Sequence, residues 1–217
     1  MKMFHNNNPF FHISLKNVFS AEELKIIFKE INELKKHFKD SNFTGSATKN
    51  SEILKKNTGI YLVESETYEN LQIIKIIDKC IKKISTNSNW KNIAFKRLFN
   101  SLMWGGELVN CYKKNDYYKP HTDNGIFSLI FFLWDNTSNF EGGDLYFPEH
   151  DYLHKCKSNH GILFFSKEMH GVTPIITNDE ESNRYSIVTF SFSDVKDKEN
   201  TASKKRNIIN FNSISYK

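Results

Sequence analysis

The spacing of apolar residues changes near residue 100, and this change limits the possible folds more than any other feature of the chain. Before it, two segments have apolar residues at helical spacing, which predicts amphipathic helices over residues 21–38 and 68–84. Ser20 and Glu23 form a capping-box pattern at the start of the first helix. We expect both apolar faces to pack into a core, because core packing is a simpler explanation than a partner-binding surface.

After residue 105 the apolar residues come in short runs that are separated by turn residues. The runs are 107–112, 117–121, 126–134, 144–147, 161–165, 172–176 and 185–192. Turn sequences such as Asn124-Gly125 and Glu141-Gly142-Gly143 lie between them. Many short strands at this spacing predict a sandwich or a barrel. We therefore expect helices in the first half of the chain to pack against a β-sandwich formed by the second half.

Composition excludes several classes of protein. The three cysteines, Cys80, Cys111 and Cys156, are too few for a disulfide framework and favour a reducing, cytoplasmic location. No apolar run has signal-peptide or membrane-spanning character, so we expect no membrane partner. The net charge of +5 comes from lysines scattered along the helices and one short run, 204–206, which indicates a solvated surface and not a nucleic-acid partner.

His121 and Asp123 lie two residues apart in one of the predicted strands. Residues i and i+2 of a strand point to the same face, so both side chains can reach one metal ion. Two histidines and one carboxylate form the facial triad that binds ferrous iron and leaves coordination positions open. His121 and Asp123 alone are a weak signal, because both residue types are common in turns. They need a second, distant histidine.

His170 is the candidate for that second histidine. It lies shortly after the apolar run 161–165, which reads as a buried strand. Fourteen residues later Arg184 opens the last predicted strand, with Ser186 on the same face. A guanidinium group with a hydroxyl beside it is suited to a bidentate contact with a carboxylate. A surface salt bridge from Arg184 to Glu180 or Glu181 is the alternative. We favour the carboxylate site because Arg184 heads an otherwise apolar strand.

The order of these residues resembles the catalytic domain of prolyl-4-hydroxylase-type iron(II)- and 2-oxoglutarate-dependent oxygenases. The resemblance covers roughly residues 105–193. It is carried by Tyr112, His121-x-Asp123, Glu141-Gly142-Gly143-Asp144-Leu145-x-Phe147, Gly161-x-x-x-Phe165, His170-Gly171-Val172 and Arg184-Tyr185-Ser186. It implies an α+β, mainly β fold, a double-stranded β-helix or jelly roll with N-terminal helices packed on one sheet. This agrees with the architecture expected from the apolar pattern.

The resemblance also implies the role of each site residue. His121, Asp123 and His170 would hold Fe(II), and Arg184 would pair with the far carboxylate of 2-oxoglutarate, where many prolyl hydroxylases use a lysine. Tyr112 matches a tyrosine whose hydroxyl supports that carboxylate, and Ser186 would add a further hydrogen bond. The cosubstrates would be 2-oxoglutarate and O2, with ascorbate as an optional reductant.

We accordingly divide a single domain, 1–217, into three regions. Residues 1–104 are predicted to be an N-terminal helical support region, 105–193 the jelly-roll catalytic core and 194–217 a polar C-terminal tail. The expected activity is hydroxylation of an unactivated C–H bond, with 2-oxoglutarate converted to succinate.

The substrate stays open at this point. A peptide or protein residue such as proline is the first hypothesis, and a free amino acid or small metabolite is the alternative. A nucleic-acid demethylase has only the modest positive charge in its favour. A non-catalytic jelly-roll binding module is the alternative of another class. The sequence also leaves open the position that is hydroxylated and the oligomeric state.

A second metal site is the remaining alternative. His150, His154, Cys156 and His160 are residue types that bind zinc, but their spacing matches no strong zinc motif, so we expect a surface loop.

Overall fold

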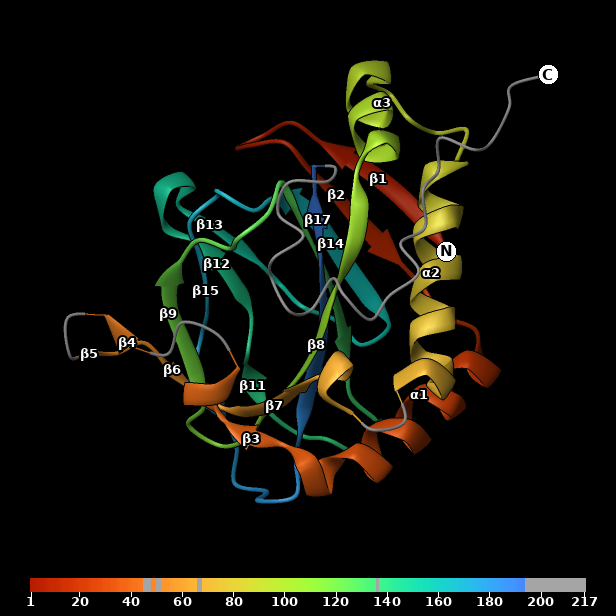
Figure 1. Cartoon of the computed structure of the whole chain (residues 1–217). Helices are drawn as coiled ribbons and strands as arrows, with labels where there is room; N and C mark the ends of the chain where they lie inside the picture. The colour runs from red at the N-terminus through yellow and green to blue at the C-terminus, as the bar shows by residue number, and fades with distance from the viewer. Residues whose placement is uncertain (45–47, 50–51, 66–67, 136, 194–217) are drawn as a thin grey trace.

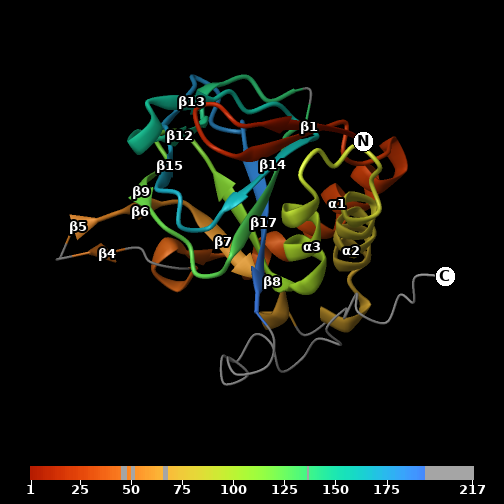
Figure 2. The same cartoon turned by 90° about the horizontal axis from the view of Figure 1, so that it is seen from above.

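The computed structural model describes residues 1–44, 48–49, 52–65, 68–135 and 137–193, so the predicted C-terminal tail lies outside the described residues. Figures 1 and 2 show three layers, with a small sheet on one side, a large sheet in the middle and the helices on the other side. The helices are α1 (Ala21–Leu34), α2 (Gln72–Ser85) and α3 (Ile93–Ser101). None of the helices within the described ranges is long and apolar enough to span a bilayer.

The large sheet has eight antiparallel strands in the order β1-β2-β14-β10-β17-β8-β7-β3. Their bounds are β1 (Lys2–Asn6), β2 (His12–Lys16), β14 (His160–Phe165), β10 (Phe127–Leu133), β17 (Arg184–Phe192), β8 (Met103–Tyr112), β7 (Thr58–Tyr61) and β3 (Lys39–Asp40). The region before residue 104 thus contributes strands as well as helices, which the apolar pattern did not predict. These strands are short and rich in Lys, His and Asn, so they show no clear alternation.

The small sheet has five strands in the order β13-β12-β15-β9-β6. They are β13 (Tyr152–His154), β12 (Leu145–Phe147), β15 (His170–Val172), β9 (Tyr117–His121) and β6 (Lys55–Lys56). Two smaller pairs join β11 (Glu141–Gly142) to β16 (Ile175–Ile176) and β4 (Thr48–Lys49) to β5 (Glu52–Ile53). The predicted run 172–176 is divided between β15 and β16, because Pro174 lacks the N–H that a continuous strand needs.

Both predicted helices are present, and their ends have local causes. The capping box is formed, because the Ser20 N–H donates to Glu23 Oε2 at 2.9 Å and the Glu23 N–H donates to Ser20 Oγ at 3.2 Å. The α-helix predicted to reach residue 38 ends at Leu34 and continues as a 3₁₀ turn, Lys35–His37. A similar 3₁₀ turn, Tyr68–Asn70, precedes α2. The isoleucines on the inner faces of α1 and α2 are buried against the large sheet.

Strand β10 shows how the two halves of the core are separated. All seven of its residues are buried. Phe127, Leu129 and Phe131 belong to the cluster beneath the helices, whereas Ile130 and Phe132 belong to the cluster between the sheets. A strand covered on both faces reads as a continuous apolar run, as the segment 126–134 does. The predicted mainly β fold, with N-terminal helices packed on one sheet, is confirmed.

Candidate metal and carboxylate site

The three predicted metal ligands lie together between the two sheets. His121 ends β9 and His170 opens β15, and the two residues are paired across these strands. The Nε2 atoms of His121 and His170 lie 3.6 and 3.4 Å from carboxylate oxygens of Asp123. The three residues offer ligand atoms that lie within 4.8 Å of one another, as one shared metal ion requires. Asp123 lies in the loop after β9 and not on the strand, so the prediction that His121 and Asp123 share one strand is wrong for Asp123.

The other ring nitrogen of each histidine is held by the backbone. Nδ1 of His121 lies 3.0 Å from the carbonyl oxygen of Lys119, and Nδ1 of His170 lies 2.9 Å from that of Glu168. A carbonyl oxygen can only accept, so each neutral ring donates its Nδ1 proton there. This leaves a lone pair on each Nε2, on the side of Asp123, which is the arrangement that metal-binding histidines need.

Asp123 is fixed by a chain of hydrogen bonds. Ser128 Oγ donates to Asp123 Oδ2 at 2.6 Å and lies 2.9 Å from Ser166 Oγ, which can donate to it in turn. The backbone N–H of Asp123 donates to the Ser166 carbonyl at 2.8 Å. Ser128 faces this loop because it lies on the inter-sheet face of β10, in step with Ile130. The carboxylate therefore has little freedom to turn away from the histidines.

The charges of the three ligands are strongly coupled. Burial alone would raise the pKa of Asp123, but His170 and His121 lower it below its ordinary value. Burial lowers the pKa of His121. Burial would also lower the pKa of His170, but the Asp123 carboxylate raises it instead. A divalent cation among these groups would compensate the same carboxylate without a proton on His170.

Tyr118 of the same strand and Lys55 of the neighbouring strand β6 support His121. The Tyr118 ring stacks on the His121 ring, with centroids 3.5 Å apart and planes at 13°. Lys55 Nζ lies 5.0 Å from the centroid of the same tyrosine ring. The ammonium group also donates to the carbonyl and hydroxyl oxygens of Thr44 at 2.8 and 3.1 Å. Burial lowers the pKa of Lys55 to about 7, opposed by the charge of Asp123.

Arg184 is a second fully buried cation near the triad, besides Lys55. It is 1% exposed and opens β17 opposite Tyr112 of β8. Its Nη2 donates to the sulfur of Cys156 at 3.7 Å, whereas Nε and Nη1 have no partner among the described residues. Buried N–H groups without a partner are costly, so they indicate a missing acceptor. A carboxylate of a bound ligand fits this requirement.

The alternative interpretation of Arg184 as a surface ion pair is wrong. The side chain is buried, and Glu180 pairs with Lys114 at 2.6 Å. The neighbouring residues Tyr185 and Ile187 pack beneath the helices, so Arg184 and Ser186 face the space between the sheets.

Tyr112 contacts Arg184, and Ser186 lies two residues after Arg184 on the same face of β17. The Arg184 guanidinium carbon is 5.0 Å from the centroid of the Tyr112 ring. Burial raises the pKa of Tyr112 to about 12, and the nearby arginine opposes this rise. The tyrosine therefore keeps its proton and remains a hydrogen-bond donor. Ser186 is buried and is paired with Asn110 of β8.

The predicted Gly142-Gly143 turn lies against the arginine. Both residues have positive φ, 75° and 65°. A Cβ at Gly142 would lie 2.0 Å from the carbonyl oxygen of Pro174, and one at Gly143 would lie 3.4 Å from Arg184 Cδ. The turn therefore requires glycine both for its conformation and for its close approach to the Pro174 carbonyl and to Ile175, whose Cδ1 would lie 2.4 Å from a Cβ at Gly143.

The alternative zinc site is not assembled in the part of the chain that the structure describes, where the only group of three or more close metal-ligating side chains is the triad. His150 lies 2.6 Å from the Glu168 carboxylate, and Cys156 contacts Arg184. The segment is not simply a loop, because it contains β13.

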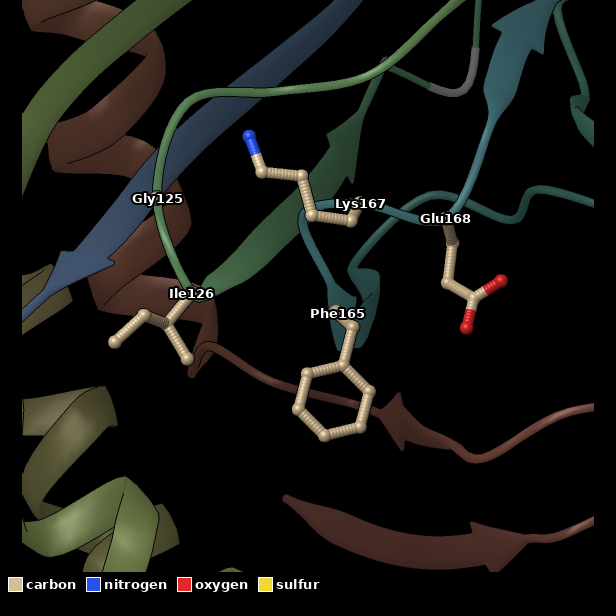
Figure 3. Close-up of a pocket in the computed structure, with 5 residues that line it drawn as sticks. All are labelled: Gly125, Ile126, Phe165, Lys167 and Glu168. Carbon is tan, nitrogen blue, oxygen red and sulfur yellow. The ribbon is translucent and has the colours of Figure 1, made fainter.

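A surface pocket borders the loop that carries Asp123 and the turn that precedes His170. It has a volume of about 490 Å³ and is lined by Gly125, Ile126, Phe165, Lys167 and Glu168 (Figure 3). Lys167 Nζ donates to the backbone carbonyl of Asp123 at 3.0 Å, so the pocket wall is linked directly to the metal-ligand loop.

Several residues that support the site were not predicted from the sequence. Ser128 is polar within an apolar strand, and that interruption was a usable signal. Lys55 carried no such signal, because it stands in the polar sequence Lys55-Lys56-Asn57 and only β6 pairing shows that it is buried. Cys156 is brought to Arg184 by tertiary contacts that spacing alone does not reveal.

Comparison with known proteins relates this geometry to one family. Residues 107–192 match the 2OG-Fe(II) oxygenase superfamily, and this segment contains all six predicted site residues. No curated protein matches the chain in sequence.

Solved structures share the fold at low sequence identity. A viral collagen prolyl hydroxylase from Paramecium Bursaria Chlorella virus-1, in its 2OG complex, is 12% identical over 84% of this chain and 96% of that chain, with a TM-score of 0.57. A Trichoplax adhaerens prolyl hydroxylase, in complex with a hypoxia inducible factor oxygen degradation domain peptide fragment, is 17% identical over 84% and 83%, with a TM-score of 0.59. A Pseudomonas putida prolyl-4-hydroxylase is 14% identical over 85% and 93%, with a TM-score of 0.60. The resemblance predicted from the sequence is confirmed.

Proposed function

We propose that the protein is an iron(II)- and 2-oxoglutarate-dependent dioxygenase that hydroxylates a peptidyl residue, because residues 107–192 match the 2OG-Fe(II) oxygenase superfamily. The observation that supports this most directly is the buried Arg184, whose unpaired N–H groups lie in the same inter-sheet space as the His-Asp-His triad. Residues 105–193 would form the catalytic core, and residues 1–104 would support it.

His121, Asp123 and His170 would hold the iron. Two imidazoles and one carboxylate suit Fe(II) and leave coordination positions for a chelating cosubstrate and for O2. The iron, 2-oxoglutarate and O2 together supply the oxidising chemistry, which yields succinate and carbon dioxide and adds one oxygen atom to the substrate.

The chain itself would orient the cosubstrate and exclude water. Arg184 would pair with the far carboxylate, with Tyr112 and Ser186 as further donors. Leu108, Ile130 and Phe132 belong to the apolar cluster that surrounds these polar groups. In such surroundings a charge-assisted contact is stronger than in water, so the carboxylate would be held in one position.

The access to the triad favours a peptide substrate over an enclosed small molecule. The side chains of His121 and Asp123 are 10% and 14% exposed, so the triad lies near the surface and is not fully enclosed. The adjacent pocket at Phe165 and Lys167 provides room beyond the metal ligands for residues that flank the modified one (Figure 3). The structural relatives include a prolyl hydroxylase with a bound peptide, which is consistent with this choice.

The proposal is tested by incubating the Fe(II)-loaded protein with 2-oxoglutarate and O2 and measuring succinate. Proline-containing peptides and free amino acids are then screened by mass spectrometry for a gain of one oxygen atom, with His170→Ala as the control. We expect succinate from the native protein and oxidation of peptides. Oxidation of free amino acids alone would support the metabolite alternative. Succinate no greater than that of the control would contradict the dioxygenase and favour a binding module.

A further inference from the structure

Cys156 is the cysteine that differs from the others in its surroundings. Cys80 and Cys111 are both 3% exposed and lie in the core beneath the helices. Cys156 is partly exposed and packs against the apolar cluster between the sheets. Its sulfur lies 3.7 Å from Arg184 Nη2. The thiol therefore belongs to the same space as the proposed far-carboxylate site.

Asp144 holds Cys156 in this position. One carboxylate oxygen of Asp144 accepts from the backbone N–H of Cys156 at 2.9 Å, and the other accepts from Lys155 Nζ at 2.7 Å. Asp144 is itself fixed, because its N–H donates to Thr173 Oγ1 at 3.0 Å and its carbonyl accepts from the Thr173 N–H at 2.9 Å. Asp144 is buried and its carboxylate accepts two hydrogen bonds, so it holds the Cys156 sulfur next to the Arg184 guanidinium.

Arg184 has N–H groups without a hydrogen-bond acceptor, and these indicate a ligand next to the Cys156 sulfur. Nη2 is directed to Cys156, while Nε and Nη1 have no partner among the described residues. A ligand carboxylate that accepts hydrogen bonds from Nε and Nη1 would bind the same guanidinium group whose Nη2 contacts the Cys156 thiol. A ligand in this position and a substituent on the sulfur would compete for one space.

We infer that Cys156 forms a wall of the 2-oxoglutarate pocket, and that its thiol reacts with small soft electrophiles only while the far-carboxylate position is empty. The inference rests on the proposed function. With iodoacetamide, the thiolate attacks the methylene carbon, a C–S bond forms, the C–I bond breaks, iodide leaves and the thiol proton goes to the buffer. The added carboxamidomethyl group then occupies the space beside Arg184.

Electrostatics acts in the same direction as the steric argument. Burial raises the pKa of the Cys156 thiol, and Arg184 opposes this rise. A carboxylate bound to Arg184 offsets the positive charge that stabilises the thiolate, so it leaves less of the reactive form.

The test measures alkylation of each cysteine by peptide mass spectrometry. The full chain is loaded with Mn(II) in place of Fe(II), and iodoacetamide is added alone, with 2-oxoglutarate or with pyruvate. Pyruvate keeps the 2-oxo acid but lacks the far carboxylate. At ten times its Kd, 2-oxoglutarate should slow alkylation of Cys156 about tenfold, because only about one site in eleven is empty. Pyruvate should not protect Cys156, and Cys80 and Cys111 should be unaffected by either acid.

A second measurement uses the alkylated protein. Alkylation should weaken 2-oxoglutarate binding by the native chain, measured by calorimetry, but should not alter the affinity of Cys156→Ser. Cosubstrate that binds without slowing alkylation, or a thiol that does not react in the empty protein, would contradict the inference and leave the proposed function intact. Undetectable 2-oxoglutarate binding by the unmodified protein would contradict the proposed function itself.

Discussion

At the scale of single residues, the hydrogen bonds to His121, His170 and Asp123 fix the tautomer and the orientation of these proposed metal ligands. His121 and His170 each give their Nδ1 proton to a backbone carbonyl, and Asp123 is bonded by Ser128. Groups in these supporting positions fix the tautomer and the orientation of a ligand. The strength of metal binding should therefore depend on residues that never touch the metal.

Removal of one ligand should abolish metal binding without unfolding the chain. In His170→Ala the backbone pairing of β15 with β9 and β12 remains possible, because it does not use the imidazole. We expect the loss of affinity to exceed the 10–100-fold that supporting residues typically contribute. Co(II) titration measures the affinity, and circular dichroism checks the fold. Normal succinate formation by this variant would contradict the triad.

Ser128→Ala should weaken metal binding by about 10–100-fold, because the Asp123 carboxylate loses the hydroxyl that orients it. Ser191→Ala is the matched control. Ser191 is also fully buried, but its hydroxyl accepts from the Phe127 N–H and not from the metal-ligand loop. Equal Co(II) affinities for the two variants would show that Ser128 has only a general structural role.

Arg184→Ala should raise the 2-oxoglutarate requirement and leave metal affinity nearly unchanged. Loss of a buried, charge-assisted contact costs about 2–5 kcal/mol, or roughly 30- to 4,000-fold in affinity. Arg184→Lys should be milder because the charge is kept, and Tyr112→Phe should cost only about 1 kcal/mol. The KM for 2-oxoglutarate and a Co(II) titration separate the two effects. An unchanged KM in Arg184→Ala would place the carboxylate anchor elsewhere.

Much of this site could be predicted from the sequence, because the chemistry needs particular residue types at positions fixed by strand geometry. His121, His170 and Arg184 fall into this class, whereas Asp123 lies in the loop after β9 and was predicted from its residue type and spacing alone. The supporting residues could not be predicted, because serine, lysine and cysteine have many ordinary roles. Ser128, Lys55 and Cys156 become informative only when the pairing of the strands shows what they face.

At the scale of elements, the pattern of apolar residues was most reliable where an element is long or buried on both faces. It located α1, α2, β10 and β17. It missed β13 and the strands near the N-terminus, which have only two to five residues and frequent polar side chains. Their pairing is decided by neighbours distant in the sequence, such as β14 beside β2. Short strands therefore depend on tertiary context.

A comparison of Gly142 with Gly106 can separate two contributions to the free energy of unfolding, that of a close contact and that of a positive φ. Gly106 has a φ of 68°, but a Cβ there would meet only Phe190 Cδ2, at 3.5 Å. Gly106→Ala should lower the free energy of unfolding by about 1–2 kcal/mol through the left-handed conformation alone. Gly142→Ala should cost more, because its Cβ would collide with the Pro174 carbonyl oxygen. Urea denaturation gives both values, and equal values would exclude the steric contribution.

At the scale of the whole molecule, the apolar core beneath the helices and the apolar core between the sheets have different roles. The helices pack on one face of the large sheet, and the small sheet lies on the other (Figure 2). His170 and Arg184 contact Phe164 and Phe132 of the apolar cluster between the sheets. The helix-side cluster is large and consists of buried isoleucine, leucine and phenylalanine residues. Each fully buried side chain of this kind contributes about 1.5–3 kcal/mol, so the fold should not depend on the metal.

Removal of the metal should therefore leave the fold intact and lower its stability only by the binding free energy. A metal at 100 times its Kd stabilises the folded state by about 2.7 kcal/mol. The expected result is an unchanged far-UV circular dichroism spectrum after chelation and a higher melting temperature when metal is restored. A protein that unfolds on chelation would show that the metal is structural.

The position of β17 has a consequence for the order in which the molecule is made. This strand is the last one in the described chain, yet it lies between β10 and β8 in the middle of the large sheet. Until residues 184–192 have been synthesised, β10 and β8 cannot be joined through β17, and Arg184 is absent from the site of the three proposed metal ligands. Long-range pairing of this kind forms late in folding. A chain without β17 would therefore hold the three proposed metal ligands without Arg184, the proposed anchor of the cosubstrate.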